Sequence, residues 1–343
     1  MENKFPAIFV QASVLTVLLA FTAHPDFACA QAQGLLEQAR KEGEVVLYTT
    51  MNISDFAVFN QAAKEKYPSL NIRHVYLASS RQVARVMQEH RAEKIQADVL
   101  GNSLETMVYY KSQGILGKYE SAEVQFLIKG FADPEGYWAS ITTDPLITGF
   151  NTREYTKRSA PRNYDDYLNP KFRGQMAINS GTAYGLLGMV SLRGEEQGIA
   201  YIRKLGQQNV RPVEGYNHIS NLLAAGEFPI AIFMQVSKID AMKRKGAPVD
   251  WLDSSPTFAT VSTVGMIRNP LHPAAARLLV DFYLSVEGQQ ALARAGKIPL
   301  RRGVKGPSKD IDQLLESDEL HLVRVGGEYD RYMRYHNEFL GVR

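Results

Sequence analysis

The sequence predicts an α/β protein of two lobes. Each lobe is expected to be a mixed, mostly parallel sheet flanked by helices, with strands forming the hinge between the lobes. Strand–turn–helix units follow one another along the first part of the chain, which is typical of parallel sheets with crossover helices. Extended segments without helical period interrupt this rhythm, and a second set of α/β units follows them.

The first set contains three strand–turn–helix units. Each strand is short and apolar, and hydroxyl or amide side chains stand at or just after its end. Each helix carries apolar residues on one face. Ser54 could cap the first of these helices, and Ser103 opens the third. The expected strands span residues 44–50, 71–77 and 97–103, and the expected helices begin near residues 54, 81 and 103.

Residues 137–152 contain two extended stretches with a proline between them and mark the passage to the second set. Its expected strands span residues 174–178, 210–216, 228–234, 248–252 and 260–267, and its helices residues 219–226, 273–283 and 286–295. The chain therefore crosses between the lobes more than once, and we expect a cleft between them. Ligands of open α/β sheets bind at the carboxyl ends of strands, where the hydroxyl-rich turns of this sequence collect.

The crossings predict the boundaries of the lobes. We expect residues 31–141 and 258–300 to form the first lobe, and residues 142–257 and 301–343 to form the second. The hinge is expected near residues 142–144 and 258–260, where the two crossing segments change lobe.

Residues 1–30 do not belong to this fold. Lys4 gives a basic start, an uncharged apolar stretch follows, and small residues on both sides of Cys29 form a cleavage site. This pattern predicts a secretory signal peptide that is removed between Ala30 and Gln31; an uncleaved anchor helix is the alternative. Cys29 is the only cysteine, so the mature chain would have no disulfide, reactive thiol or cysteine-based zinc site.

The sequence has 343 residues, of which 45% are hydrophobic and 22% are charged, and a formal net charge of +3. This is the composition of an ordinary globular protein of about two domains. A charge this small does not indicate nucleic-acid binding, and we expect no nucleic-acid partner. Beyond the first thirty residues, no apolar run approaches the roughly 20 residues of a membrane-spanning helix.

Motifs for catalysis are missing from the sequence. It contains no nucleophile elbow, no phosphate-binding loop of the nucleotide hydrolases and no zinc-protease motif. Ser180 as a nucleophile would need a histidine base, and no histidine lies in a turn that converges on it. The candidates are His74, His90, His218, His272, His321 and His336. A secreted hydrolase that uses Ser180 or a carboxylate is therefore a lesser alternative, and we expect no catalytic residues.

Binding of an anion requires less of the sequence. The first turn of a helix carries unpaired N–H groups and a partial positive charge, and serine or threonine hydroxyls add further donors. Ser80, Ser103 and the segment Ser180–Thr182 all stand where a strand passes into a helix. Three such turns favour a polar pocket, although each hydroxyl alone could be an ordinary helix cap.

Four blocks of the sequence resemble one family. Residues 268–304 resemble the C-terminal signature of bacterial extracellular solute-binding proteins of ABC importers, above all the ferric-iron-type and phosphonate-type branch. Residues 110–119, 168–178 and 226–232 resemble other blocks of that family in the same order. The resemblance implies a type II periplasmic-binding-protein fold, a periplasmic location, a small-molecule ligand, a permease partner in the inner membrane, a monomer and no cofactor.

The ligands of ferric iron in that branch are absent here. The positions of its tyrosine pair hold Val236 and Ser237, its histidine falls on Asn52 and its glutamate falls on Ser103. Ferric iron is a hard cation that binds phenolate and carboxylate oxygens, so we expect no metal site. A protein that binds ferric iron or a metal chelate remains the alternative within the family.

The resemblance also implies the ligand class. Ser180–Thr182 matches the turn that holds the anion in iron-type members, and Asn217 matches a nearby asparagine, so we expect a small solute with a phosphonate, phosphate or carboxylate group. Arg81 could pair with that group or be a solvated charge at a helix end. The expected ligand-binding residues are Thr50, Asn52, Ser79, Ser80, Arg81, Ser103, Thr142, Ser180, Gly181, Thr182, Tyr216, Asn217, Gln235 and Ser237.

The sequence leaves one more alternative for the function, which is sensing of the solute instead of import. A two-lobed sensor that presents its ligand to a receptor would have the same sequence features as an import protein. The basic segment at residues 237–246 could dock a partner, or it could be a solvated helix face.

Overall fold

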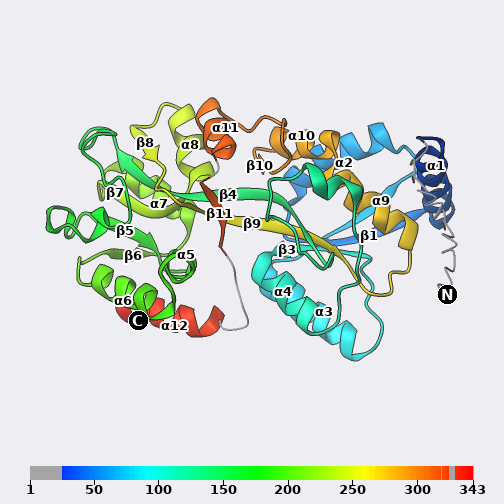
Figure 1. Ribbon diagram of the computed structural model, residues 1–343, viewed down its shortest axis with the longest axis horizontal. Helices are drawn as coiled ribbons and strands as arrows, with labels where there is room; N and C mark the ends of the chain where they lie inside the picture. Colours follow the sequence, from blue (N-terminus) through cyan, green and yellow to red (C-terminus); the bar gives the residue numbers. More distant parts are fainter. Residues whose placement is uncertain (1–24, 318, 324–328, 343) are drawn as a thin grey trace, which may run out of the picture.

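The computed structural model describes residues 25–317, 319–323 and 329–342. It is an elongated molecule in which two groups of helices are joined by a pair of long strands (Figure 1). The predicted signal peptide lies outside the described residues except for its end, which is the start of helix α1 (Pro25–Glu42). No described helix is both long enough and apolar enough to cross a membrane.

The first group is built on a parallel sheet, as the sequence predicts. Strand β1 lies between β2 and β3 and is parallel to both. Its elements in chain order are β1 (Glu44–Thr49), α2 (Ile53–Lys66), β2 (Asn71–Tyr76), α3 (Ser79–Arg91), β3 (Val99–Ser103) and α4 (Leu104–Ser112), followed by the 3-10 helix η1 (Ala122–Phe126). Helices α9 (Pro273–Leu284) and α10 (Val286–Arg294) return to this group from the far part of the chain.

The second group repeats this arrangement around β5, which is parallel to both β6 and β7. Its elements are the 3-10 helices η2 (Asp166–Leu168) and η3 (Pro170–Phe172), then β5 (Met176–Asn179), α5 (Tyr184–Arg193), α6 (Glu195–Gly206), β6 (Arg211–Val213), α7 (Tyr216–Ala225), β7 (Ile230–Gln235), α8 (Val236–Arg244) and β8 (Val249–Leu252). The last elements of the chain are β10 (Ile298–Pro299), α11 (Lys309–Glu316), β11 (Leu320–Leu322) and α12 (Tyr329–Leu340). They lie on the second group or beside the strands that join the two groups.

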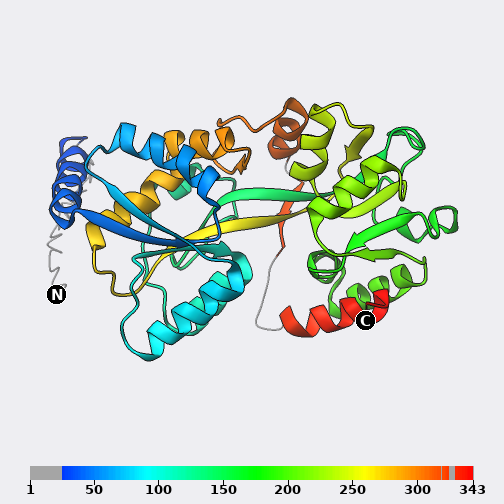
Figure 2. The same cartoon turned by 180° about the vertical axis from the view of Figure 1, so that it is seen from behind.

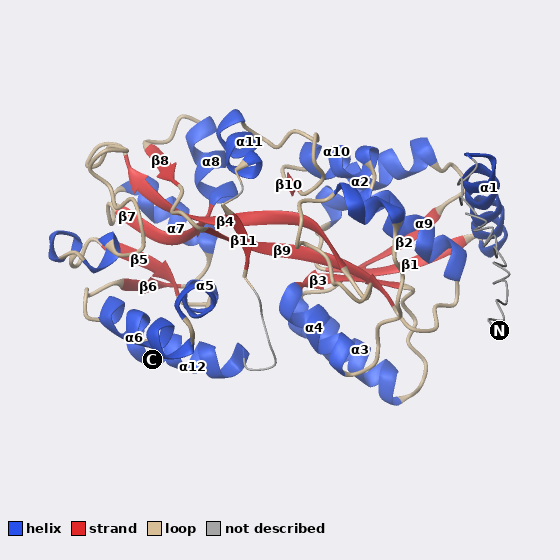
Figure 3. Cartoon of the chain, in the orientation of Figure 1, coloured by secondary structure: helices blue, strands red, loops and turns tan. Residues whose placement is uncertain are grey.

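Two antiparallel strands, β4 (Ala139–Asn151) and β9 (Thr257–Met266), run between the groups (Figures 2 and 3). The sequence predicts two extended stretches separated at Pro145, and this is wrong, because β4 is one strand. The strand pairs with β9 up to Pro145 and with β7 from Leu146 onward. Proline lacks an N–H group, and here that loss falls where the strand changes its partner.

The apolar cores also divide at these strands. Buried side chains of β1, α2, α9 and the first part of β4 form one core, and those of β5, α5, α6 and the second part of β4 form another. Phe258 packs in the second core and its neighbour Ala259 in the first. The structure is thus a two-lobed α/β fold with a strand hinge, and the exact lobe boundaries stay a prediction.

Candidate functional site

The carboxyl ends of the strands in the two lobes face one another. Strand β3 is antiparallel to β9 and ends at Ser103, which pairs with Ser262, the residue opposite Thr142 of β4. Strand β7 runs the opposite way and ends at Gln235, opposite Leu146 of β4. Four residues of an extended strand span about 13 Å at roughly 3.3 Å per residue. The ends of β3 and β7 are therefore offset by about this length along the strands, and the two crossing strands β9 and β4 lie between them.

Asp144 lies between these two turns. Its carboxylate accepts hydrogen bonds from the backbone N–H group of Ser237, at 3.0 Å, and from the Ser237 hydroxyl. The Thr260 hydroxyl donates to the Asp144 carbonyl oxygen at 3.1 Å and so ties β9 to β4. Burial raises the pKa of the Asp144 carboxyl above its usual value, against the opposing effect of the Ser237 hydrogen bonds. Ser237 is thus engaged by the protein itself, and Asp144 caps helix α8.

Helix α2 is capped as well, although not by the residue that the sequence predicts. Asn52 is its N-cap, and the Asn52 side chain accepts the N–H group of Asp55 at 2.9 Å. Ser54 lies inside the helix and donates its hydroxyl to the Asn52 side chain. The prediction of Ser54 as the cap is wrong, because the helix begins one residue before it.

Four other helices at the carboxyl ends of strands have no side-chain cap. The side chains of their N-cap residues accept no hydrogen bond from the first turn, although the N–H groups of Ser103 and Gly215 themselves donate to Asn102 and Asn179. Their N-cap residues are Ala78, Ser103, Ala183 and Gly215. Each such end keeps unpaired N–H donors and the positive end of a helix dipole. Two of the four helices belong to each lobe.

The hydroxyls predicted as possible caps have other positions. Helix α5 begins at Tyr184 and its N-cap is Ala183, so Ser180 does not cap it. Ser79 and Ser80 lie within the first turn of α3. The reading in which Ser180 or Ser80 serves only as a helix cap is therefore wrong.

Asn179 holds the second lobe's turns together. Its side-chain oxygen accepts the N–H groups of Gly181 and Gly215, each at 3.0 Å. A hydrogen bond of 3.0 Å joins the Thr182 hydroxyl to the Tyr216 hydroxyl. From helix α12, the buried His336 donates Nε2–H to the Asn179 carbonyl oxygen at 3.0 Å. The structure therefore brings Ser180–Thr182 and Tyr216 together, and their binding of a ligand stays a prediction.

The first lobe's turns are linked in a similar way. The Ser79 hydroxyl donates to the Asn102 side chain at 2.9 Å, and Asn102 donates to Gln82 at 2.7 Å. The Ser103 and Thr106 hydroxyls are 3.3 Å apart. These bonds join the start of α3 to the end of β3, so two of the four uncapped helices are fixed side by side.

The remaining expected residues are more scattered. Thr142 is buried in β4, Thr50 and Gln235 are partly buried at strand ends, and Asn52, Ser80 and Asn217 are exposed. Arg81 is exposed and lines a shallow groove along α3 with Arg85 and Gln88. In the basic segment, Lys243 and Arg244 form ion pairs with Asp250, Asp310 and Asp240.

Sequence reasoning missed a contact between the lobes. The Tyr184 hydroxyl of α5 donates to the Glu105 carboxylate of α4 at 2.8 Å. Tyr329, at the start of α12, packs its ring 6.1 Å from that of Tyr184. Burial raises the pKa of Tyr184 far above its usual value, with Glu105 as the next cause, so its phenol stays protonated. Only the position of Glu105 directly after the third strand could have drawn attention to it.

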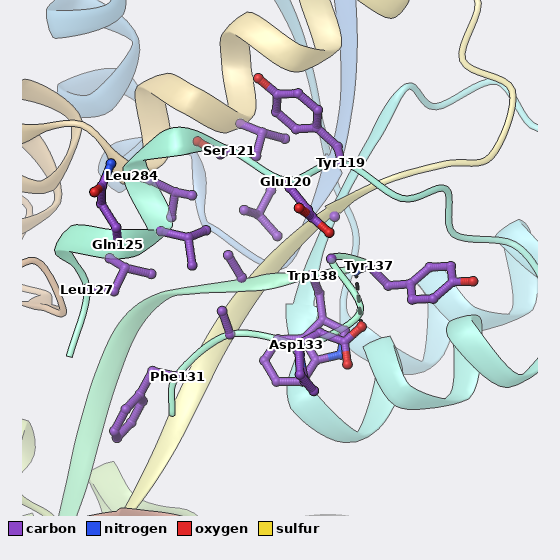
Figure 4. Close-up of a pocket in the computed structure, with 18 of the residues that line it drawn as sticks. Tyr119, Glu120, Ser121, Gln125, Leu127, Phe131, Asp133, Tyr137, Trp138 and Leu284 are labelled. Atoms are coloured by element: carbon purple, nitrogen blue, oxygen red, sulfur yellow. Dashed lines mark hydrogen bonds between the residues drawn. The ribbon is translucent and has the colours of Figure 1, made fainter. Parts of the chain in front are cut away.

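A cavity lies away from these turns. It has a volume of about 660 Å³ and lies between the segment 119–138 and strand β9, toward the start of β4 and away from the hinge. Figure 4 shows its lining, in which Trp138 and Phe131 lie on one side and Leu127 and Leu284 on another. It contains none of the expected site residues.

No metal centre of the usual kind is found among the described residues. No three histidine, cysteine, aspartate or glutamate side chains there come close enough to hold an ion. Val236 is fully buried, and the oxygens of Asn52 and Ser237 already have protein partners.

Comparison with solved structures places the fold. The chain is similar to iron-bound HitA from Pseudomonas aeruginosa, with 18% identity and a TM-score of 0.72 over 86% of this chain and 99% of that one. It is similar to the Trichodesmium protein IdiA (FutA) in complex with iron and citrate, with 16% identity and a TM-score of 0.75 over 87% and 99%. AfuA from Actinobacillus pleuropneumoniae, with fructose-6-phosphate bound, matches at 21% identity and a TM-score of 0.63 over 87% and 98%.

The family model of the bacterial extracellular solute-binding proteins matches residues 101–319, which is more than half of the chain. This segment includes the end of β3, both crossing strands and the whole of the second lobe up to α11. The family predicted from the sequence blocks is confirmed. The chain belongs to the bacterial extracellular solute-binding proteins, whose members bind and hand over solutes for ABC importers.

Proposed function

We propose that this protein captures a small anionic solute between its lobes in the periplasm and delivers it to an ABC permease in the inner membrane. The solute carries a phosphonate, phosphate or carboxylate group. The observation that carries this proposal is the set of uncapped helices α3, α4, α5 and α7, two from each lobe, at strand ends that face one another.

The physical reason is the charge at a helix start. Free N–H groups and the helix dipole form a ready site for an anion, and the Ser180 and Thr182 hydroxyls add donors. Solute bound in one lobe would attract the other lobe's helix ends. We infer that the lobes, with the boundaries given above, close about residues 142–144 and 258–260.

Two of the similar structures carry anionic organic molecules, fructose-6-phosphate and citrate, and two carry iron. Of these bound species, the anion suits the residues of this chain and the iron does not. Val236 offers no donor atom, and the Ser237 hydroxyl and the Asn52 side-chain oxygen are bound within the protein. The protein acts as a monomer without catalysis, as the sequence predicts, and His336, which reaches the turn at Asn179, is bound through Nε2 to a carbonyl oxygen.

Native mass spectrometry of protein purified from its periplasm without refolding tests this proposal. We expect a bound molecule of a few hundred daltons that contains an acidic group and is released on denaturation. A bound metal ion without an organic anion, or a neutral solute, would contradict it.

A further inference from the structure

The cavity in Figure 4 lies within the apolar core of the first lobe. Leu127, Phe131, Val264 and Leu284 line it, and each is at most 3% exposed and belongs to that core. Protein interiors are close-packed, with few voids larger than a water molecule. The volume of about 660 Å³ instead falls within the roughly 300–1,000 Å³ of small-molecule sites. The cavity therefore has the size and the lining of a binding site for an apolar group.

Two cations stand at one side of this cavity. Lys129 and Arg302 line it, and they also line a second cavity of about 650 Å³ beside it. Within the described part of the chain, neither forms an ion pair with a carboxylate. Arg302 Nη2 donates to the Gln125 carbonyl oxygen at 2.7 Å, which leaves other N–H donors of the guanidinium for an anion.

The carboxylates that line the first cavity are engaged elsewhere or lie apart from these cations. Asp133 accepts hydrogen bonds from Lys111 Nζ at 3.0 and 3.1 Å. Glu120 comes before η1 and its side chain lies against Gly136, whereas Arg302 is bound at Gln125 near the end of η1. The cavity is thus apolar along its walls and positive at the rim that it shares with the second cavity.

The carboxylates of the second cavity have partners too. Asp312 accepts the N–H group of Gly306 at 2.6 Å, and Glu316 accepts a hydrogen bond from Lys305 at 3.2 Å. The two cations of the shared rim are therefore left to a ligand.

We propose that the first cavity binds an amphipathic carboxylate, such as a fatty acid. Its alkyl chain lies among the apolar side chains, and its carboxylate lies at Lys129 and Arg302. A guanidinium matches the planar geometry of a carboxylate and can donate two parallel hydrogen bonds to it. This site is separate from the cleft between the lobes, because none of the residues expected to bind the solute line it, and it does not depend on the function proposed above.

The fluorescence of Trp138 can report on this cavity. The chain has two tryptophans, of which Trp138 lines the cavity and Trp251 packs in the core of the second lobe. The Trp251 indole N–H group has no hydrogen-bond partner in the described structure, so Trp251→Phe removes no such bond and leaves Trp138 as the only emitter. Butanoate, hexanoate, octanoate and decanoate should change its emission, with an affinity that rises roughly 4-fold for each added methylene.

The head group of the probe tests the charge of the rim. Decanoate, decan-1-ol and decyltrimethylammonium have the same alkyl chain and carry a negative, a neutral and a positive head. We expect decanoate to bind at least 10-fold more tightly than decyltrimethylammonium, which is the lower end of the range for a hydrogen bond to a charged group. Decan-1-ol should fall between them.

Exposed positions allow a variant that should keep the fold. Lys129→Gln combined with Arg302→Gln removes both charges of the rim. This variant should bind decanoate at least 10-fold more weakly than the wild type and decan-1-ol equally well. Arg294→Gln removes another exposed charge, on α10 and outside the cavity, and is the matched control that should behave as the wild type.

Three results would overturn the proposal. An affinity that does not rise with chain length would exclude an alkyl site, and equal affinities for decanoate and decyltrimethylammonium would exclude its anionic end. A change in emission with decanoate in the Trp138→Phe variant, where only Trp251 emits, would place the probe in the second lobe. Propyl phosphate, as an anion probe for the cleft, should not displace decanoate, and displacement would mean that both bind in the cleft.

Discussion

Two sets of helices begin in different ways in this protein. Helices α10 and α11 begin under serine side chains, where Ser285 accepts the N–H group of Gly288 and Ser308 accepts that of Ile311. Helices α3, α4, α5 and α7, at the facing strand ends, have no such cap in the described structure. Hydroxyl residues are present there too, and those of Ser79 and Thr182 bond to other side chains. Among the described helices, four of those that begin where the lobes meet lack a side-chain cap, whereas α2 and α8 there are capped by Asn52 and Asp144, and α6 elsewhere is uncapped.

The largest effect should come from placing a fixed anion at the uncapped end of α5. Gly181 is exposed, and the nearest heavy atoms to an added Cβ would be Asn179 Oδ1 at 3.4 Å and Glu214 Cγ at 3.7 Å, so a side chain fits. Gly181→Asp should weaken binding of propyl phosphate at least 100-fold, since a like charge occupies the anion's position. Gly181→Asn has the same size without the charge and should lose much less. Equal loss in both variants, measured by calorimetry, would mean that bulk and not charge is responsible.

Ser180→Ala should have the next largest effect. It removes one hydroxyl donor to the anion and should weaken propyl phosphate binding by roughly 10- to 150-fold. The melting temperature without ligand should not change, because Ser180 is not the N-cap of α5. Unchanged affinity with a lower melting temperature would show that the residue has only a structural role.

Ser285→Ala is the counterpart on the capped side. It removes the cap of α10 and should lower the free energy of unfolding by about 1 kcal/mol, or the melting temperature by roughly 2–4 °C. Propyl phosphate affinity should equal that of the wild type. A loss of affinity here would mean that capped and uncapped helices do not divide by function as we infer.

The smallest effect should come from the addition of ferric citrate, which tests whether the protein binds ferric iron. With Val236, Ser237, Asn52 and Ser103 at the iron-type positions, no tyrosinate charge-transfer band is expected in the visible spectrum. A band of stoichiometric intensity would show that other phenols, such as Tyr184 and Tyr329, supply the ligands.

The fold could be predicted from the sequence because its evidence is local. Apolar strands such as β1 and amphipathic helices such as α3 show in the spacing of their own residues, and the four family blocks fix their order. Pro145 misled the prediction of the crossing strand, since a proline is tolerated where the strand exchanges partners. The cap of α2 was predicted two residues too late. Ser54 and Asn52 are equally good cap residues, and only the backbone decides between them.

The site could be predicted only in part. Ser180–Thr182 and Tyr216 lie close together, as expected from strand ends that share an edge. Glu105 and Tyr329 were missed because their contact with the second lobe's turns depends on how the lobes face each other, and no local pattern encodes it.

The most direct test of the account measures the helix N–H groups themselves. Backbone amide NMR signals of Tyr184, Gly185 and the first residues of α3, α4 and α7 should shift on titration with propyl phosphate, as expected for N–H groups that donate to an anion. The corresponding signals of α10, at Val286 and Glu287, should stay in place. Shifts of equal size in both sets, or none at Tyr184 and Gly185 under saturation, would contradict the claim that the uncapped helices bind the ligand.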